Sequence, residues 1–316
     1  MENFKEFKAR YLNPLTDFGF HKIFGTEANK GLLIDFLNEV IRGESVIIDI
    51  EYFRSEQWGF VETNRKAVFD IFCKTKNGES FIVEMQKAKQ AYFRDRSIFY
   101  ASLPILNQAV KGIWDFRLKA VYLVAILDFL IFEEFEDDRK YVVEHVSLMR
   151  ERTKTVFSDK LKFAFVELPK FNKKEKELVA HFDKWLYLLR NLPKLKSRPE
   201  SVGGKIFDEL FDLADIKRLT KEDMETYKSS VLEYYDVQSA MMCAREEGRE
   251  EGIQKGILKG RKEGIRKGIE KGILKGIENE KIATIQKCLQ KNIAIDDIVF
   301  LTGYSKEQIM KLGISN

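Results

Sequence analysis

The stretch "AVFDIFCKTKNGESFIVEMQ", residues 67–86, has the pattern of two short apolar strands on either side of an Asn-Gly turn. Two acidic residues, Asp70 and Glu84, stand inside these apolar runs. Because an ionised carboxylate in apolar surroundings is costly or shifts its pKa, each needs a partner, a cation or water. The hairpin therefore predicts either a metal site or a solvated pair of carboxylates on an open sheet face.

The length of the turn decides whether the two carboxylates meet. A two-residue loop sets Asp70 opposite Met85 and sends Asp70 and Glu84 to opposite faces. A three-residue loop that starts at Lys76, with Gly78 in the left-handed conformation as a bulge, sets Asp70 opposite Glu84. We predict the bulged register because it sorts the side chains by polarity.

In this register the hairpin has two different faces. The apolar face holds Phe69, Ile71, Cys73, Phe81, Val83 and Met85. The other face holds Asp70, Glu84 and Gln86 together with Val68, Phe72 and Ile82. Opposed residues have Cβ atoms roughly 5 Å apart, which suits two carboxylates that hold one Mg²⁺ at about 2.1 Å per oxygen.

The elements around the hairpin predict an α/β sandwich. Residues 29–41 have one apolar helical face, made by Leu33, Phe36, Leu37, Val40 and Ile41. The other expected elements are a strand in 45–53, a helix over 93–112 with a kink near Pro104, one or two buried strands in 120–132, strands in 141–149 and 162–171, and an amphipathic helix over 174–192 with Phe182, Trp185, Leu186 and Leu189 toward the core. The order helix, strand, strand, strand, helix, strand is typical of this class.

Composition restricts the class of protein. A chain of 316 residues with 44% hydrophobic content predicts one large domain and an appendage. The longest apolar run, residues 120–132, is interrupted by Asp128 and is too short to span a bilayer. The first residues lack the apolar segment of a secretory signal, and three distant cysteines fit a reducing compartment, so we expect a cytoplasmic protein without a membrane partner. A net charge of +4 permits a phosphate-rich partner without requiring one.

The hairpin and its flanks resemble a known family. Asp70, followed after thirteen residues by Glu84-Met85-Gln86, is similar to the D-x(n)-E-x-K/Q core of the PD-(D/E)XK nucleases, and specifically to their nuclease-family transposases, akin to the recombination-promoting nucleases. The supporting stretches are "NPLTDFGFHKIFG", "LLIDFLNEV", "FRDRSIFYAS", "FVELPKFNKKEKELVAHFDKWLYLLRN" and a glycine-rich repeat near the C-terminus.

The resemblance implies a restriction-endonuclease-like mixed β-sheet core flanked by helices, with an α-helical C-terminal appendage. It also implies metal-dependent hydrolysis of phosphodiesters in double-stranded DNA, linked to mobile DNA or recombination. Asp70, Glu84 and the Met85 backbone carbonyl would bind one or two Mg²⁺ ions, with Mn²⁺ as an alternative. The competing expectation is a non-catalytic DNA-binding or oligomerising protein that keeps the nuclease fold.

Gln86 departs from the lysine that is usual in the superfamily. A glutamine amide orients water or phosphate by hydrogen bonds, whereas a lysine also supplies positive charge. We count Gln86 as a catalytic candidate that makes the reaction depend more on the metal. Lys87 is expected to point to the opposite face of the strand and does not replace the missing charge.

Residues outside the hairpin have two interpretations each. Asp17 is either a third acidic residue of the site or an N-cap, and Glu39 is a weaker candidate that fits a solvated helix position. Arg96 and Tyr100, one helical turn apart, either hold a DNA phosphate or form an ion pair and a core aromatic.

Glycine recurs at every fourth position from 248 to 276 within a charged segment. Eight interior glycines cost a helix about 6 to 8 kcal/mol relative to alanine, so a stable helix here needs close packing. We expect either homo-oligomerisation through this repeat or a charged spacer.

The expected organisation is a nuclease-like core over 1–195, a helical extension over 196–242, the repeat over 243–280 and a small helical segment over 281–316. The last segment predicts three short helices, with a capping box at 305–308. It resembles the helical end of a helix-turn-helix unit and equally fits a small packing or oligomerisation bundle.

Overall fold

The computed structural model describes residues 9–41, 43, 46–53 and 69–313. The chain divides into two compact units, residues 1–242 and 243–316. The first unit contains a six-stranded sheet, and the second contains a small helical bundle. Among the described residues, no helix has both the length and the apolar character that crossing a membrane requires.

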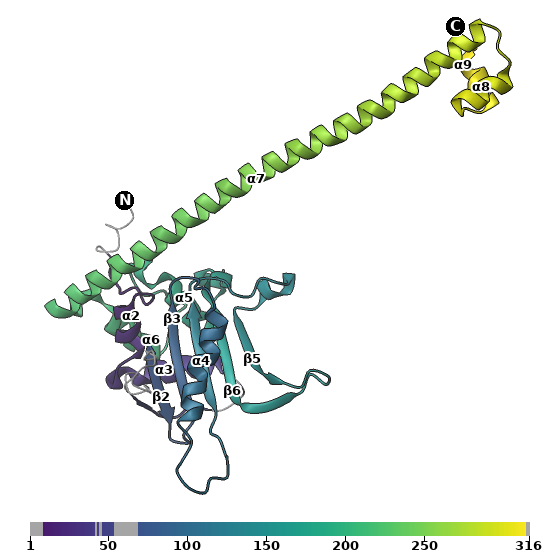
Figure 1. Cartoon of the computed structure of the whole chain (residues 1–316). Helices are drawn as coiled ribbons and strands as arrows, with labels where there is room; N and C mark the ends of the chain where they lie inside the picture. The colour runs from purple at the N-terminus through teal and green to yellow at the C-terminus, as the bar shows by residue number, and fades with distance from the viewer. Residues whose placement is uncertain (1–8, 42, 44–45, 54–68, 314–316) are drawn as a thin grey trace, which may run out of the picture. The chain divides into compact units, whose positions relative to one another are not determined.

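The sheet is mixed and has the strand order β1-β2-β3-β4-β6-β5. Its strands are β1 (Ile50–Tyr52), β2 (Ile71–Thr75), β3 (Ser80–Gln86), β4 (Val121–Leu127), β5 (Val143–Met149) and β6 (Val156–Glu167). The central strands β3, β4 and β6 run parallel, while β1, β2 and β5 pair antiparallel with their neighbours (Figure 1). β3 and β4 are buried along their whole length, as is typical of parallel strands covered on both faces.

The β2–β3 hairpin confirms the bulged register. Ile71 lies opposite Val83, and the loop between the paired residues Thr75 and Glu79 is three residues long. Gly78 has a φ of +84°, and its N–H donates to the Thr75 carbonyl at 2.9 Å. A left-handed glycine at this position therefore sets which side chains share a face of the sheet.

Helices cover both faces of the sheet and make it a sandwich. The helices of the first unit are α2 (Asp17–Phe24), α3 (Lys30–Val40), α4 (Phe93–Leu106), α5 (His181–Asn191), α6 (Lys205–Ala214) and the start of α7 (Lys221–Gln290). All of them except α4 contribute to one hydrophobic cluster, whereas α4 contributes to a second cluster on the opposite face (Figure 1). The predicted apolar face of α3 is buried in the larger cluster. The α/β fold expected from the order of the elements is confirmed.

The predicted faces of the hairpin are correct from Ile71 onward. Five of the six expected apolar residues belong to the larger cluster. Phe69 is the exception, because it packs with Phe72 and Ile82 on the side of α4. It precedes the first residue of β2, so the strict alternation of a strand does not apply to it. Val68 lies outside the described residues.

Two predicted helix boundaries in the first unit are wrong. α4 ends at Leu106 rather than at residue 112, because Pro104 cannot donate to the preceding turn and the exposed Val110 provides no buried face. α5 begins at His181 rather than at residue 174, because the Asp183 carboxylate accepts the N–H of Ala180 at 3.1 Å and thereby ends the preceding loop. Short 3-10 turns occupy Glu27–Asn29, Glu136–Lys140, Leu168–Lys170, Glu175–Glu177, Leu192–Lys194 and Ile216–Arg218.

The glycine repeat lies within α7, a continuous helix from Lys221 to Gln290. The expected first short helix of the C-terminal segment is wrong, since those residues are the end of α7. Two further helices, α8 (Ile295–Thr302) and α9 (Lys306–Gly313), pack with it around Ile285, Ile298 and Ile309. The capping box is confirmed, because Ser305 and Gln308 exchange side-chain to backbone hydrogen bonds of 2.9 and 3.3 Å.

Candidate active site

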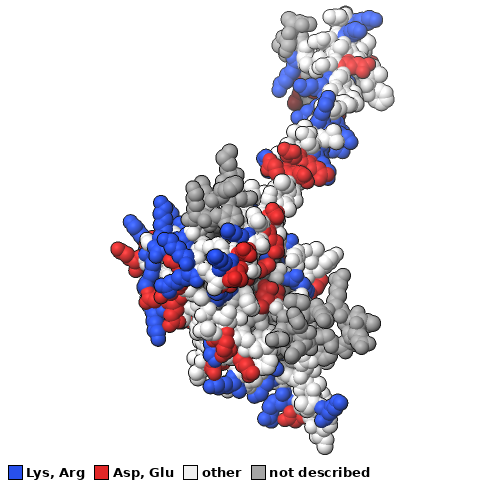
Figure 2. Space-filling model, turned by 90° about the vertical axis from the view of Figure 1, so that its left-hand side faces the viewer, with Lys and Arg blue, Asp and Glu red and all other residues white. Residues whose placement is uncertain are grey.

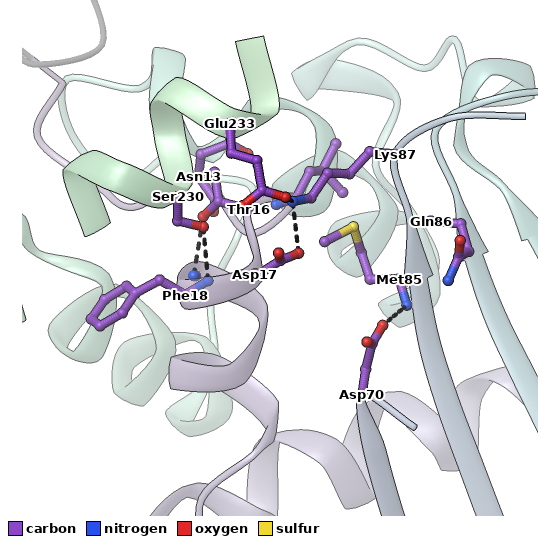
Figure 3. Close-up of polar contacts among 12 residues, drawn as sticks. Asn13, Thr16, Asp17, Phe18, Asp70, Met85, Gln86, Lys87, Ser230 and Glu233 are labelled. Carbon is purple, nitrogen blue, oxygen red and sulfur yellow. Dashed lines mark hydrogen bonds and ion pairs between the residues drawn. The ribbon is translucent and has the colours of Figure 1, made fainter. Parts of the chain in front are cut away.

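Asp70 and Glu84 lie opposite each other at one end of the β2–β3 hairpin. Asp70 directly precedes β2, and Glu84 follows Val83, the residue that pairs with Ile71, so the two residues stand at the same end of the hairpin. Glu84 lies on the face that α4 covers, because its carboxylate is 3.8 Å from the Arg96 guanidinium. Asp70 Oδ2 accepts the backbone N–H of Met85 at 2.8 Å (Figure 3). Asp70 is exposed to solvent, whereas Glu84 is only 3% exposed. One carboxylate is thus accessible and the other is deeply placed.

Glu84 has one oxygen without a partner. Gln86 Nε2 donates to Glu84 Oε2 at 3.0 Å. The other oxygen, Oε1, is buried and has no hydrogen-bond partner among the described residues. A buried carboxylate oxygen left unpaired is costly, so such an oxygen needs an ion or a water molecule as its partner. Together with Asp70 opposite it, this oxygen fits a hard divalent cation, which prefers oxygen ligands.

Both carboxyl groups have raised pKa values. Burial of Glu84, together with the charge of Asp70, raises the pKa of Glu84 to about 8, although the Arg96 guanidinium opposes the shift. The protein atoms packed around Asp70 raise its pKa to about 6, against the lowering effect of the Met85 N–H. Two carboxyl groups that hold protons this tightly are typical of functional sites that await a cation.

Asp17 lies near this pair, at the first position of α2. Thr16 is the N-cap of α2, because its hydroxyl accepts the N–H of Gly19 at 3.1 Å, so the N-cap interpretation of Asp17 is wrong. The Asp17 carboxylate, 62% exposed, forms a 2.7 Å ion pair with Lys87 (Figure 3). Its charge contributes to the raised pKa of Asp70. Within the described residues, no three His, Cys, Asp or Glu side chains are grouped closely enough to hold a metal.

Lys87 forms two ion pairs with distant residues that the sequence did not predict. Its side chain is only 9% exposed, and its ammonium group contacts both Asp17 and, at 3.4 Å, Glu233. Its charge also lowers the pKa of Asp70. The contact with Glu233 joins residues 146 positions apart, so no local pattern reveals it.

The first turns of α7 pack over the end of β3. Gln238 Nε2 donates to the Lys87 carbonyl at 3.3 Å and to Asp128 Oδ2 at 3.1 Å. The Tyr234 hydroxyl donates to the same Asp128 oxygen at 2.9 Å. Asp128, the first residue after β4, therefore has a structural reason to interrupt the apolar run of residues 120–132. α7 thus holds the residues that directly follow β3 and β4.

The N-terminal motif serves to dock α2 against α7. The Asn13 N–H donates to the Tyr227 hydroxyl at 2.9 Å, and the Phe18 N–H donates to Ser230 Oγ at 3.1 Å (Figure 3). A Cβ at Gly19 would stand 2.0 Å from the Asn13 carbonyl oxygen, so only glycine fits there. The motif places Asp17 beside Lys87 through backbone packing.

Arg96 and Tyr100 of α4 border the carboxylate pair. Arg96 Nη2 lies 3.8 Å from Glu84 Oε2, and the guanidinium stands 5.4 Å from the centre of the Tyr100 ring. Glu84 and Asp70 both raise the pKa of the Tyr100 hydroxyl, after the larger effect of its burial. Glu39 lies on α3, on the other face of the sheet, and has no place in this cluster.

The comparisons with known proteins agree with this geometry. Residues 14–244 match the model of a family described as PD-(D/E)XK nuclease family transposase. No curated protein and no solved structure matches the chain. The match covers the N-terminal motif, the hairpin, α4 and the docked start of α7. On this match and this fold, the chain belongs to the PD-(D/E)XK nuclease family transposases.

Proposed function

We propose that this protein is a Mg²⁺-dependent endonuclease that hydrolyses phosphodiester bonds in double-stranded DNA. The observation that supports this best is the pair of opposed carboxylates, one of which has a buried and unpartnered oxygen. Asp70, Glu84 and the Met85 carbonyl would hold Mg²⁺, and Mn²⁺ suits the same ligands. The chemistry that such an ion supplies is polarisation of the phosphate and a lower pKa for water.

The remaining residues of the site have supporting roles in this proposal. Gln86 fixes the Glu84 carboxylate through its amide and so determines which oxygen stays free. Asp17 holds Lys87 near Asp70 through an ion pair, and the charges of both residues act on the pKa of Asp70. Because Gln86 brings no charge, a divalent ion held by Asp70 and Glu84, together with nearby cationic side chains, would supply the positive charge next to the phosphate.

The competing function is a non-catalytic DNA-binding or oligomerising protein that retains the nuclease fold. It is favoured by Gln86, whose amide is engaged with Glu84 where the superfamily usually has a free lysine. Family membership supports a nuclease-related role. The link to mobile DNA or recombination and the location in the cytoplasm are parts of our proposal, and the activity of the site distinguishes the two functions.

A plasmid-nicking assay in Mg²⁺ distinguishes these functions. The wild-type protein should convert supercoiled plasmid to nicked or linear DNA, and Asp70→Ala should abolish the conversion. Asp115→Ala is a matched control, because Asp115 is exposed in the loop after α4 and pairs with Arg117. Equal cleavage by wild type and Asp70→Ala would exclude the proposed site. Absence of cleavage in all variants, with DNA binding intact, would favour the non-catalytic protein.

A further inference from the structure

Among the described residues, Arg96 is the cation that forms an ion pair with Glu84, on the face of the sheet that α4 covers. It lies on the same face as Glu84, and its charge affects both carboxyl groups of the pair. The guanidinium is 5.3 Å from the centre of the Phe93 ring and 5.4 Å from that of Tyr100. These two rings hold its position while leaving the side chain 28% exposed.

Most hydrogen-bond donors of Arg96 are unused. An arginine side chain has five N–H donors. In the described part of the chain, Arg96 Nη1 donates to the Gln90 side chain, and Nη2 stays 3.8 Å from Glu84, which is beyond hydrogen-bond distance. Aromatic rings fix this guanidinium, and its free N–H donors can form two parallel hydrogen bonds to one phosphate group.

The other cation near the pair is not available in the same way. The ammonium group of Lys87 forms ion pairs with the carboxylates of Asp17 and Glu233, and the Lys87 side chain is nearly buried. On the face of the molecule in Figure 2, Lys and Arg side chains lie among Asp and Glu side chains. Of the two described cations near the pair, Lys87 is thus held by carboxylates, whereas Arg96 keeps donors available for a phosphate.

We propose that Arg96 binds the phosphate group of the DNA strand that lies at the Asp70–Glu84 pair, with the Tyr100 hydroxyl as a second donor. This inference rests on the proposed function, since it names the group that holds the substrate of that same site. Arg96 provides the positive charge that Gln86 lacks. The alternative role, in which Arg96 only balances the charge of Glu84, predicts no contact with DNA.

The salt dependence of DNA binding tests this inference without any cleavage. Affinity for a short duplex is measured with Ca²⁺ in place of Mg²⁺ at several salt concentrations, for wild type, Arg96→Ala and Arg96→Lys. Loss of one phosphate contact should reduce the slope of log affinity against log salt by about one and weaken binding roughly tenfold, alike for different DNA sequences. Arg96→Lys should restore the slope.

Arg94→Ala is the matched control. Arg94 lies on the same helix, but its guanidinium pairs with Glu134 and stacks on Phe132, away from the carboxylates. It should keep the wild-type slope. An unchanged slope in Arg96→Ala, with wild type binding DNA, would overturn the inference and leave the nuclease proposal standing. Absence of DNA binding by wild type would overturn the proposed function itself, and thermal melting of each variant verifies the fold.

Discussion

At the scale of single residues, Glu84 is the most unusual group in the molecule. It is buried, one of its oxygens has no partner among the described residues, and its pKa is raised to about 8. A residue of this kind lowers the stability of the metal-free protein, because the unfolded chain ionises it freely. Such a group fits a role in binding a cation rather than a role in folding.

The pH dependence of stability should reveal this group. Between the unfolded pKa of 4.5 and the folded pKa of about 8, the native protein keeps a proton that the unfolded chain has lost. The free energy of unfolding of metal-free protein should therefore fall as pH rises through this range. Glu84→Gln should remove this part of the decline. Urea denaturation in EDTA at pH 5, 6.5 and 8 measures it, and parallel profiles for the two proteins would contradict the assignment.

Gly19 is the residue whose size matters most for the N-terminal motif. Its substitution by alanine places a Cβ 2.0 Å from a backbone oxygen of Asn13, which cannot move without shifting the contact with Tyr227. We expect Gly19→Ala to destabilise the protein by about 1 to 3 kcal/mol. Gly31→Ala, at an open position in α3, should instead stabilise it by about 0.5 to 1 kcal/mol. Chemical denaturation of both variants tests the contrast.

At the scale of elements, the β2–β3 hairpin decides the site. The three-residue loop sets the register, and the register places Glu84 on the face that α4 covers, with Asp70 at the same end of the hairpin. A shift by one residue would move every side chain of one strand to the other face. α4 then adds Arg96 and Tyr100, and the start of α7 secures the chain that follows β3.

Substitution of Gly78 should weaken the hairpin through its backbone conformation. The residue has a φ of +84°, and a Cβ there would meet Lys119 only at an ordinary contact distance of 3.4 Å. The expected loss for Gly78→Ala is therefore the left-handed penalty of about 1 to 2 kcal/mol. Urea denaturation measures it. An unchanged free energy of unfolding in Gly78→Ala would mean that the turn can adopt another conformation. Gly78→Asn should be less destabilised than Gly78→Ala, because asparagine tolerates the left-handed conformation better.

At the scale of the whole molecule, α7 belongs to both compact units. Its first turns dock against the sheet, and its last turns form part of the C-terminal bundle. In between, the glycine repeat exposes isoleucine side chains at 253, 257, 265, 269, 273 and 277. Apart from the helix's own backbone and the adjacent residues, no atom of the described residues lies within 4 Å of the Cβ positions of the eight repeat glycines. A helix with this many glycines and exposed isoleucines gains stability by packing against another helix.

We therefore propose that the repeat forms a homo-oligomer, and the mass in solution tests it. The wild-type protein should exceed the monomer mass of 37.0 kDa in light scattering. Replacing Ile265, Ile269 and Ile273 together by glutamine should reduce the mass to that of the monomer, because the packed apolar row is lost. A control with Arg261 and Lys262 changed to glutamine should keep the oligomer. A monomeric wild type would exclude this role for the repeat.

The sequence alone determined the register of the hairpin, the pairing of Asp70 with Glu84 and the α/β sandwich. Turn chemistry and the alternation of apolar residues are local, so they can be recognised without knowing the rest of the chain. The positions of Asp17, Lys87 and Arg96 were decided only by the tertiary structure. Lys87 meets Asp17 and Glu233 through the docking of α2 and α7, and Arg96 approaches Glu84 because α4 crosses that face of the sheet. Such contacts depend on how distant elements pack, which no local pattern specifies.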